Sequence, residues 1–154
     1  MYHRCPGFAS SVADLMLRSR QSADTAYLNA ITYPTNELRD RGVFEAALAI
    51  AGDKSASVPA RVFANRVLYW ALLPSAGVDY NTLVDIDGDG RDKCIRYGQS
   101  FHYSVKTTSE LPSDYREQSY RVTWAATRDL TEPAPVRQSA ACVAVVARPR
   151  SGEF

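Results

Sequence analysis

The stretch SYRVTWAAT, Ser119–Thr127, decides the fold class that this 154-residue sequence predicts. Its apolar residues stand at alternate positions: Tyr120, Val122, Trp124 and Ala126. Polar residues such as Arg121 and Thr123 separate them. A period of two is typical of a β-strand that buries one face. The stretch is therefore predicted to be a strand.

Two further stretches extend this pattern into a sheet. CIRYGQSFHYSVKTT, residues 94–108, alternates most regularly and is the strongest predicted strand. SAACVAVVAR, residues 139–148, is more uniformly apolar and supplies another strand. The proline-containing, charged segments at 109–118 and 129–138 are predicted loops. Residues 94–150 thus predict an antiparallel meander of three strands, or four if NTLVDI at 81–86 joins it.

The first half of the chain has a helical period instead. Residues 12–30 carry apolar side chains three and four positions apart, with a predicted break near Ser19–Ser22. A second helix is predicted from an N-cap at Thr35 or Asn36 to a stop at Gly52. A third is predicted from a cap at Ser57, with Pro59 in its first turn, to Pro74.

The last two predicted helices resemble a HEAT-like repeat. The first carries AALAIAGD and the second PARVFANRVL, and the resemblance covers about residues 36–73. It implies a helical hairpin of a kind that scaffolds or binds other proteins. With the predicted strands, the fold class is α+β. The predicted division is a helical subdomain at 1–84, a loop at 85–93, the β meander at 94–150 and a tail at 151–154.

Between the halves lies DIDGDGRD, a candidate calcium loop. Asp85, Asp87 and Asp89 stand at alternate positions, and the intervening glycines permit a tight backbone path around one cation. The order resembles the start of an EF-hand loop and the DxDGDG loops of FG-GAP propeller blades. That resemblance implies three carboxylate ligands followed by the Arg91 carbonyl.

The loop departs from both families at its end. Arg96 stands where an EF-hand has its bidentate glutamate, and Lys93 where secreted modules usually have an acid. Asp92 is then the candidate replacement ligand. The expected calcium affinity is weak, about 0.1 to 1 mM, and the expected role is structural. The alternative interpretation is a glycine-rich turn with solvated carboxylates.

Composition narrows the function classes. A net charge of +1 gives no field suited to nucleic acid, and no apolar run reaches the length of a membrane span. Of the three cysteines, Cys94 and Cys142 lie in predicted strands, so they are either a disulfide pair or two buried thiols. Cys5 is then left over. A weak calcium site fills only where calcium is near millimolar, which favours an extracytoplasmic, secreted protein.

Catalytic patterns are sparse. His102 has only Ser100 and Ser104 as nearby serines, and the sequence lacks a GxSxG elbow, a P-loop, a GxGxxG and an HExxH. Carboxylates Glu110, Asp114 and Glu117 cluster in one predicted loop. The alternating aromatic residues, Tyr120 and Trp124 among them, predict core packing, with a sugar or peptide platform as the alternative.

These observations predict a non-catalytic, extracytoplasmic module for protein binding or self-assembly, with a calcium-stabilised loop. One alternative is a small hydrolase that uses His102 or the Glu110–Glu117 loop between the helices and the sheet. The other is a cytoplasmic adaptor of HEAT-like type, for which reduced cysteines and no calcium are expected.

Overall fold

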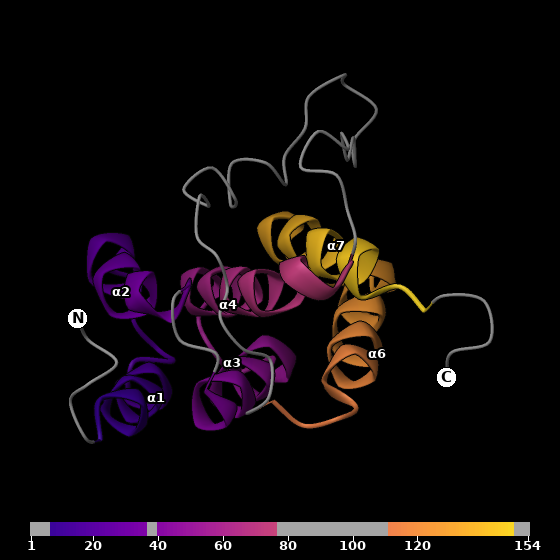
Figure 1. The fold of residues 1–154 in the computed structure, drawn as a ribbon. Helices are drawn as coiled ribbons and strands as arrows, with labels where there is room; N and C mark the ends of the chain where they lie inside the picture. The colour runs from indigo at the N-terminus through magenta and orange to yellow at the C-terminus, as the bar shows by residue number, and fades with distance from the viewer. Residues whose placement is uncertain (1–6, 37–39, 77–110, 150–154) are drawn as a thin grey trace.

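The computed structural model describes residues 7–36, 40–76 and 111–149 (Figure 1). Those residues form six α-helices and a short 3-10 helix, and they contain no strand. The elements are α1 Phe8–Arg18, α2 Thr25–Thr32, η2 Tyr33–Asn36, α3 Arg41–Gly52, α4 Val58–Ala76, α6 Tyr115–Arg128 and α7 Ala134–Ala147. The predicted α+β class is wrong, and the described part of the chain is a helical bundle.

The predicted strand at Ser119–Thr127 lies inside helix α6, and the buried face explains the error. Ser119 and Thr123 are fully buried, whereas Trp124 is 43% exposed. The Thr123 hydroxyl donates to the Ser119 carbonyl at 2.7 Å, and the Thr127 hydroxyl donates to the Thr123 carbonyl at 2.7 Å. The two threonine hydroxyls are therefore satisfied by carbonyls of their own helix, whereas the buried Ser119 hydroxyl has no hydrogen-bond partner among the described residues. Because small polar residues pack inward here, the alternation of apolar residues did not mark the buried face.

The predicted strand at 139–148 is also wrong, because these residues belong mostly to helix α7. Residues 139–144 are all buried, so no apolar and polar faces alternate in this segment. A short, uniformly apolar run fits a buried strand or a buried helix equally well, and its alanines favour the helix. The helix starts directly after Pro133 and has Pro135 in its first turn. The predicted strands at 81–86 and 94–108 lie outside the described residues.

The helices predicted in the first half are confirmed, with shifted ends. The expected break separates α1 from α2, and α3 ends at Gly52 as predicted. Its cap is Asp40, whose carboxylate accepts from the Val43 N–H at 3.0 Å, instead of Thr35 or Asn36. Ser57 does cap α4, accepting from the Ala60 N–H at 3.2 Å. Helix α4 continues two residues past Pro74.

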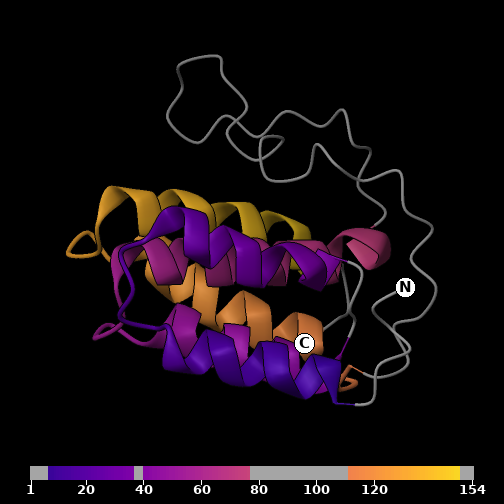
Figure 2. The same ribbon diagram turned by 90° about the vertical axis from the view of Figure 1, so that its left-hand side faces the viewer.

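The six helices form three consecutive antiparallel pairs, α1–α2, α3–α4 and α6–α7, stacked side by side. Figure 2 shows the resulting two layers, with α2, α4 and α7 in one and α1, α3 and α6 in the other. Helix α4 is central, packing against α2, α3, α6 and α7. Buried residues from all three pairs, such as Met16, Phe44 and Val143, belong to one continuous hydrophobic core. None of the described helices is both long and apolar enough to cross a membrane.

Candidate functional site

The turns inside the second and third helix pairs have the same construction. In the α3–α4 turn, Asp53 Oδ1 accepts from the backbone N–H and the hydroxyl of Ser55, at 2.8 and 2.6 Å. In the α6–α7 turn, Asp129 Oδ1 accepts from the same two groups of Thr131, at 2.9 and 2.6 Å. Both aspartates directly follow the first helix of their pair. The two turns are therefore equivalent, with 76 positions between matching residues.

An arginine in the second helix of each pair continues the correspondence. Arg61 Nε donates to the Ala51 carbonyl at 3.3 Å, and Arg137 Nε donates to the Thr127 carbonyl at 3.3 Å. Each arginine thus ties its helix to the end of the preceding helix. Helices α4 and α7 also begin at matching positions, Val58 and Ala134. The second and third pairs are two copies of one structural unit, as in repeat proteins.

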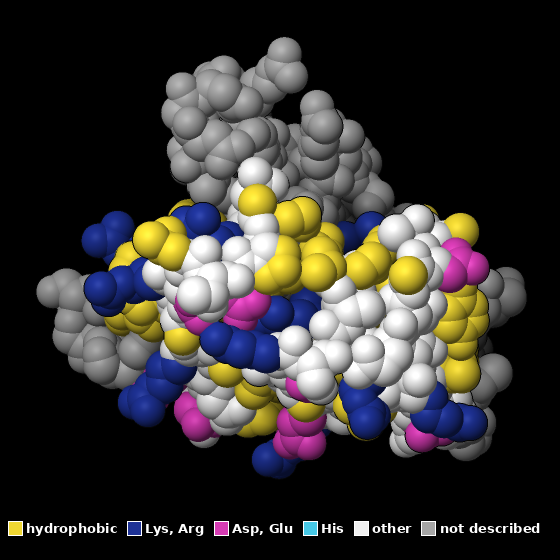
Figure 3. Space-filling view, turned by 180° about the vertical axis from the view of Figure 1, so that it is seen from behind, with side chains coloured by type: hydrophobic (Ala, Val, Ile, Leu, Met, Phe, Trp, Pro, Cys, Tyr) yellow, Lys and Arg dark blue, Asp and Glu magenta, His cyan; other side chains and the backbone are white. Residues whose placement is uncertain are grey.

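A buried ion pair joins these two units at their turns. The Arg61 guanidinium binds Glu132 through two hydrogen bonds of 2.6 and 2.8 Å, and their side chains are only 3% and 5% exposed. Lys54 adds a contact to Asp129 at 2.6 Å across the same junction. The edge of the molecule that holds the turns faces the viewer in Figure 3, where basic and acidic side chains adjoin near the middle. We call this edge, residues 19–24, 53–57 and 129–133, the turn edge.

The charges of the turn edge shift one another's titration. The paired Arg61 guanidinium lowers the pKa of Glu132 below its ordinary value of 4.5, against the opposing effect of burial. The hydrogen bond from Lys54 lowers the pKa of Asp129, and the same contact raises the pKa of Lys54. All three groups therefore stay charged at neutral pH, and the arrangement holds the two helix pairs together.

The first turn is fixed to the second by hydrogen bonds without charge. The Ser57 backbone N–H donates to the Arg20 carbonyl at 2.8 Å, and its hydroxyl donates to the Ser22 carbonyl at 2.5 Å. The Gln21 amide donates to the Ser55 carbonyl at 2.8 Å. Figure 2 shows the three turns along one side of the stack. All three pairs are therefore bonded to their neighbours at the turn edge.

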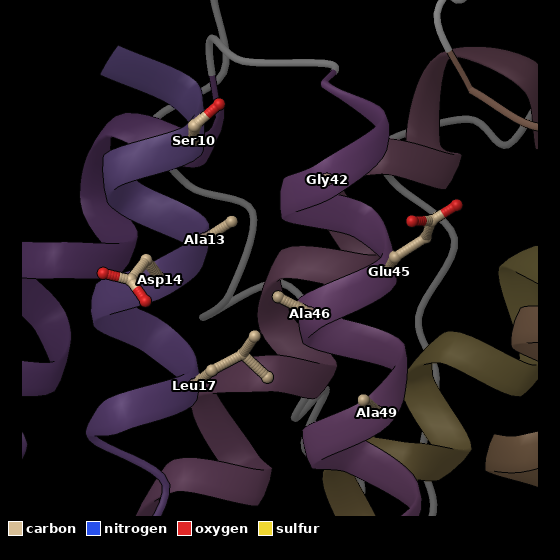
Figure 4. Close-up of a pocket in the computed structure, with 8 residues that line it drawn as sticks. All are labelled: Ser10, Ala13, Asp14, Leu17, Gly42, Glu45, Ala46 and Ala49. Carbon is tan, nitrogen blue, oxygen red and sulfur yellow. The ribbon is translucent and has the colours of Figure 1, made fainter. Parts of the chain in front are cut away.

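A shallow groove of about 450 Å³ lies between α1 and α3, on the layer opposite α4 (Figure 4). Small residues, Ala13, Gly42 and Ala46, form its floor. Asp14 and Glu45 stand on its two sides, and each is paired with an arginine of its own helix, Arg18 and Arg41 respectively. The rim is consequently close to neutral, and the groove suits a small, weakly polar side chain better than a charged ligand.

A second surface lies on α6, where the exposed Trp124 adjoins Tyr120, a partly buried residue that also packs against the core. Tyr120 and Trp124 stack with their ring centroids 5.9 Å apart and their planes 10° apart. The Arg128 guanidinium lies 5.7 Å from the Trp124 ring centroid. The residues stand four apart, so they form one column along the helix. Trp124 was predicted to pack in the core, and its exposure shows that this prediction is wrong.

The predicted site residues are only partly placed. The candidate calcium ligands Asp85, Asp87, Asp89, Arg91 and Asp92 lie outside the described residues, as does His102. Among residues 7–36, 40–76 and 111–149, no group of three or more His, Cys, Asp or Glu side chains is arranged to hold a metal ion.

Of the acidic residues proposed for the hydrolase, Asp114 and Glu117 lie in the described part of the chain, and Glu110 lies outside it. Asp114 precedes α6 and accepts from the Gln118 amide at 2.7 Å. Glu117 lies in the first turn of α6, where it pairs with Arg121. Both carboxylates therefore take part in contacts along one helix, in what had been predicted to be a loop.

Arg61, Glu132 and Arg137 were missed by the sequence analysis. A signal for the two arginines was present, because Asp53, Ser55, Pro59 and Arg61 recur as Asp129, Thr131, Pro135 and Arg137 at the same spacing. The second occurrence lay wholly within the segment 129–138 that had been predicted to be a loop. A search for internal repeats would have found both arginines together.

Three comparisons with known proteins found no match. No protein-family model matches the chain, and neither the curated proteins nor the solved structures contain a match.

Proposed function

We propose that this chain is a non-catalytic protein-binding module built on a short helical-repeat scaffold. One observation carries the proposal: three helix pairs stack side by side and are joined at the turn edge, and two of them share the same turn hydrogen bonds and the same arginine contact. Stacked pairs of this kind create extended surfaces along each layer, and repeat proteins use such surfaces to bind other proteins. The HEAT-like resemblance of residues 36–73 supports the same function.

The proposal places the module outside the cytoplasm. Cys142 is disulfide-bonded, and both other cysteines, Cys5 and Cys94, lie outside the described residues. Structural disulfides persist mainly in oxidising compartments, so this bond supports secretion over the cytoplasmic adaptor. The helical scaffold itself is common to both alternatives.

Selection from a displayed library of helical peptides tests the binding function. We expect sequences to be enriched on the intact chain over an unrelated helical protein of similar size. Amide hydrogen exchange of the chain with an enriched peptide should show added protection on the outer faces of the described helices. Failure of any sequence to be enriched over the control protein would remove the support for a binding module.

The candidate calcium loop makes an independent prediction. If Asp85, Asp87 and Asp89 bind calcium with a dissociation constant of about 1 mM, then about 10 mM calcium stabilises the chain by roughly 1.4 kcal/mol. In thermal unfolding, the midpoint should rise by about 2–6 °C relative to EDTA. The double variant Asp87→Ala, Asp89→Ala should show no rise. Equal midpoints with calcium and EDTA in the native chain would identify the segment as a turn.

A further inference from the structure

Within the chain, the third helix pair docks on a specific surface of the second. Phe44 of α3 meets Tyr115 of α6 edge to face, with ring centroids 6.3 Å apart. One turn before the end of α3, Leu48 packs against the core, and a Cβ at Gly52 would lie 3.5 Å from Val122. Arg61 completes this docking surface by binding Glu132 of the incoming turn.

The third pair carries matching residues, 76 positions later. Tyr120 corresponds to Phe44, Trp124 to Leu48, Arg128 to Gly52 and Arg137 to Arg61. Because the two pairs share their turn geometry, these four residues occupy the place at which a following pair would dock. We call them the end face: Tyr120, Trp124, Arg128 and Arg137.

Trp124 and Arg137 of the end face keep the binding groups of the internal interface, and no further helix pair follows α6 and α7 among the described residues. Trp124 is 43% exposed, although its counterpart Leu48 is partly buried. Arg137 is held through Nε by the Thr127 carbonyl, as Arg61 is held by Ala51. Its Nη atoms make no hydrogen bond to any residue of the described ranges, whereas those of Arg61 bind Glu132. The guanidinium is thus positioned to receive a carboxylate.

We propose that the end face docks a helix of another protein, one with an apolar stripe that covers Trp124 and a carboxylate that binds Arg137. This inference rests on the proposed binding function and names its partner class. The internal α3–α6 interface supplies the template, in which an aromatic contact and an arginine–glutamate pair act together. Exposed tryptophan and arginine are also the residues most enriched among strong contacts at protein interfaces.

Charge favours an acidic partner. Helix α6 contains three arginines and one glutamate, and that glutamate pairs with Arg121. Arg128 takes the place of Gly52, so a partner meets a second guanidinium beside Trp124 where the internal template has no side chain. A basic partner would bring like charges against Arg128 and Arg137, which is unfavourable in a contact that excludes water.

A second copy of this chain is a poorer occupant. Stacked head to tail, it would present the turn between α1 and α2, in which Ala23 precedes the Asp24 cap. Glu132 holds the matching place in the third pair, where it precedes Pro133 and α7. The same turn also carries Arg18 and Arg20 at its start. The first pair therefore offers no carboxylate in place of Glu132, and its Arg18 is already paired with Asp14.

The test uses the full chain and a synthetic amphipathic helical peptide of about 20 residues, long enough to hold helical structure, with leucine and alanine on one face and glutamate on the other. Binding of the labelled peptide is followed by fluorescence anisotropy at low and high salt. We expect binding that weakens with salt, and a version with lysine for glutamate should not bind. Trp124→Ala and Arg137→Gln should each weaken binding about tenfold.

Arg18→Gln, at the opposite end of the stack, is the matched control and should bind the peptide as the native chain does. Circular dichroism of each variant checks that the helices persist. The inference is overturned if the native chain ignores the acidic peptide, if both peptides bind equally, or if the end-face variants keep full affinity. It is also overturned if sedimentation shows a dimer that Trp124→Ala dissociates. If peptides enriched from the displayed library protect the α1–α3 groove from hydrogen exchange and leave the end face unprotected, the end-face inference fails. The proposed binding function would still be supported.

Discussion

Replacing Glu132 with alanine is expected to lower the free energy of unfolding by about 3–5 kcal/mol, the loss typical of breaking one partner out of a buried ion pair. The variant leaves the Arg61 guanidinium buried at 3% exposure, without the two carboxylate oxygens that now bind it. Urea unfolding at pH 7, followed by circular dichroism, measures the change. The loss falls on the junction between the second and third helix pairs.

Two matched variants separate the buried pair from ordinary surface charge. Glu45→Ala breaks the exposed pair with Arg41 and should cost less than about 1 kcal/mol. The double variant Arg61→Met, Glu132→Leu removes both charges together and should recover most of the stability, because no unpaired charge stays buried. If Glu132→Ala costs no more than Glu45→Ala, the Arg61–Glu132 pair does not hold the stack together.

The same ion pair gives the stability a pH dependence with a definite sign. The pKa of Glu132 is lowered in the folded chain, so the unfolded chain binds its proton first as the pH falls. The stabilisation is present above the ordinary carboxyl pKa, near 4.5, and is lost as the pH falls through the lower folded value. The Arg61→Met, Glu132→Leu variant should therefore lose less stability than the native chain between about pH 5 and pH 3.

Local signals in the sequence were sufficient for the first half of the fold. The break between α1 and α2, the end of α3 at Gly52 and the cap at Ser57 all follow from residue types whose preferences are local. Asp40 was missed as a cap because the first part of the segment resembled a helix start at Thr35 or Asn36. The error amounts to a few residues at one helix end.

The prediction for the second half of the fold was wrong because polar residues are buried there and an aromatic residue is exposed. Helix α6 buries Ser119 and Thr123 and exposes Trp124, so the apolar residues that suggested a sheet face are distributed around a helix. Tertiary packing determined the outcome, since the small side chains of Ser119 and Thr123 are buried inside the bundle, and the Thr123 hydroxyl bonds to a carbonyl of its own helix. The stretch alone contained no information about which neighbour would cover it.

The candidate surfaces were recognisable only through the repeat. Neither Arg61 nor Arg137 stands out in its own segment, and each gains meaning from the matching residue 76 positions away. The acidic partner Glu132 has no counterpart in the second turn, where Ala56 stands at the matching position. A long-range pair of this kind depends on which helix pairs stack, which the sequence pattern does not specify.

Phe44→Ala should lower stability and keep peptide binding, whereas Trp124→Ala should keep stability and lose peptide binding. Each residue lies on the first helix of its pair, on the side to which a following pair docks. Phe44 is 1% exposed because α6 covers it, so its truncation should cost about 3–5 kcal/mol. Trp124 is the larger side chain, yet at 43% exposure its truncation should cost about 1 kcal/mol or less. Urea unfolding of both variants measures the difference.

The acidic helical peptide then makes the comparison specific to the end face. A ligand that binds only the folded chain raises the unfolding midpoint, so saturating peptide should stabilise the native chain and leave Trp124→Ala almost unchanged. Phe44→Ala should still gain stability from the peptide, because its truncation lies at the internal interface and leaves Trp124 and Arg137 in place. A Trp124→Ala variant that unfolds as easily as Phe44→Ala would show that Trp124 is already covered in the native chain, and the end face would then be part of the core instead of a surface for a partner.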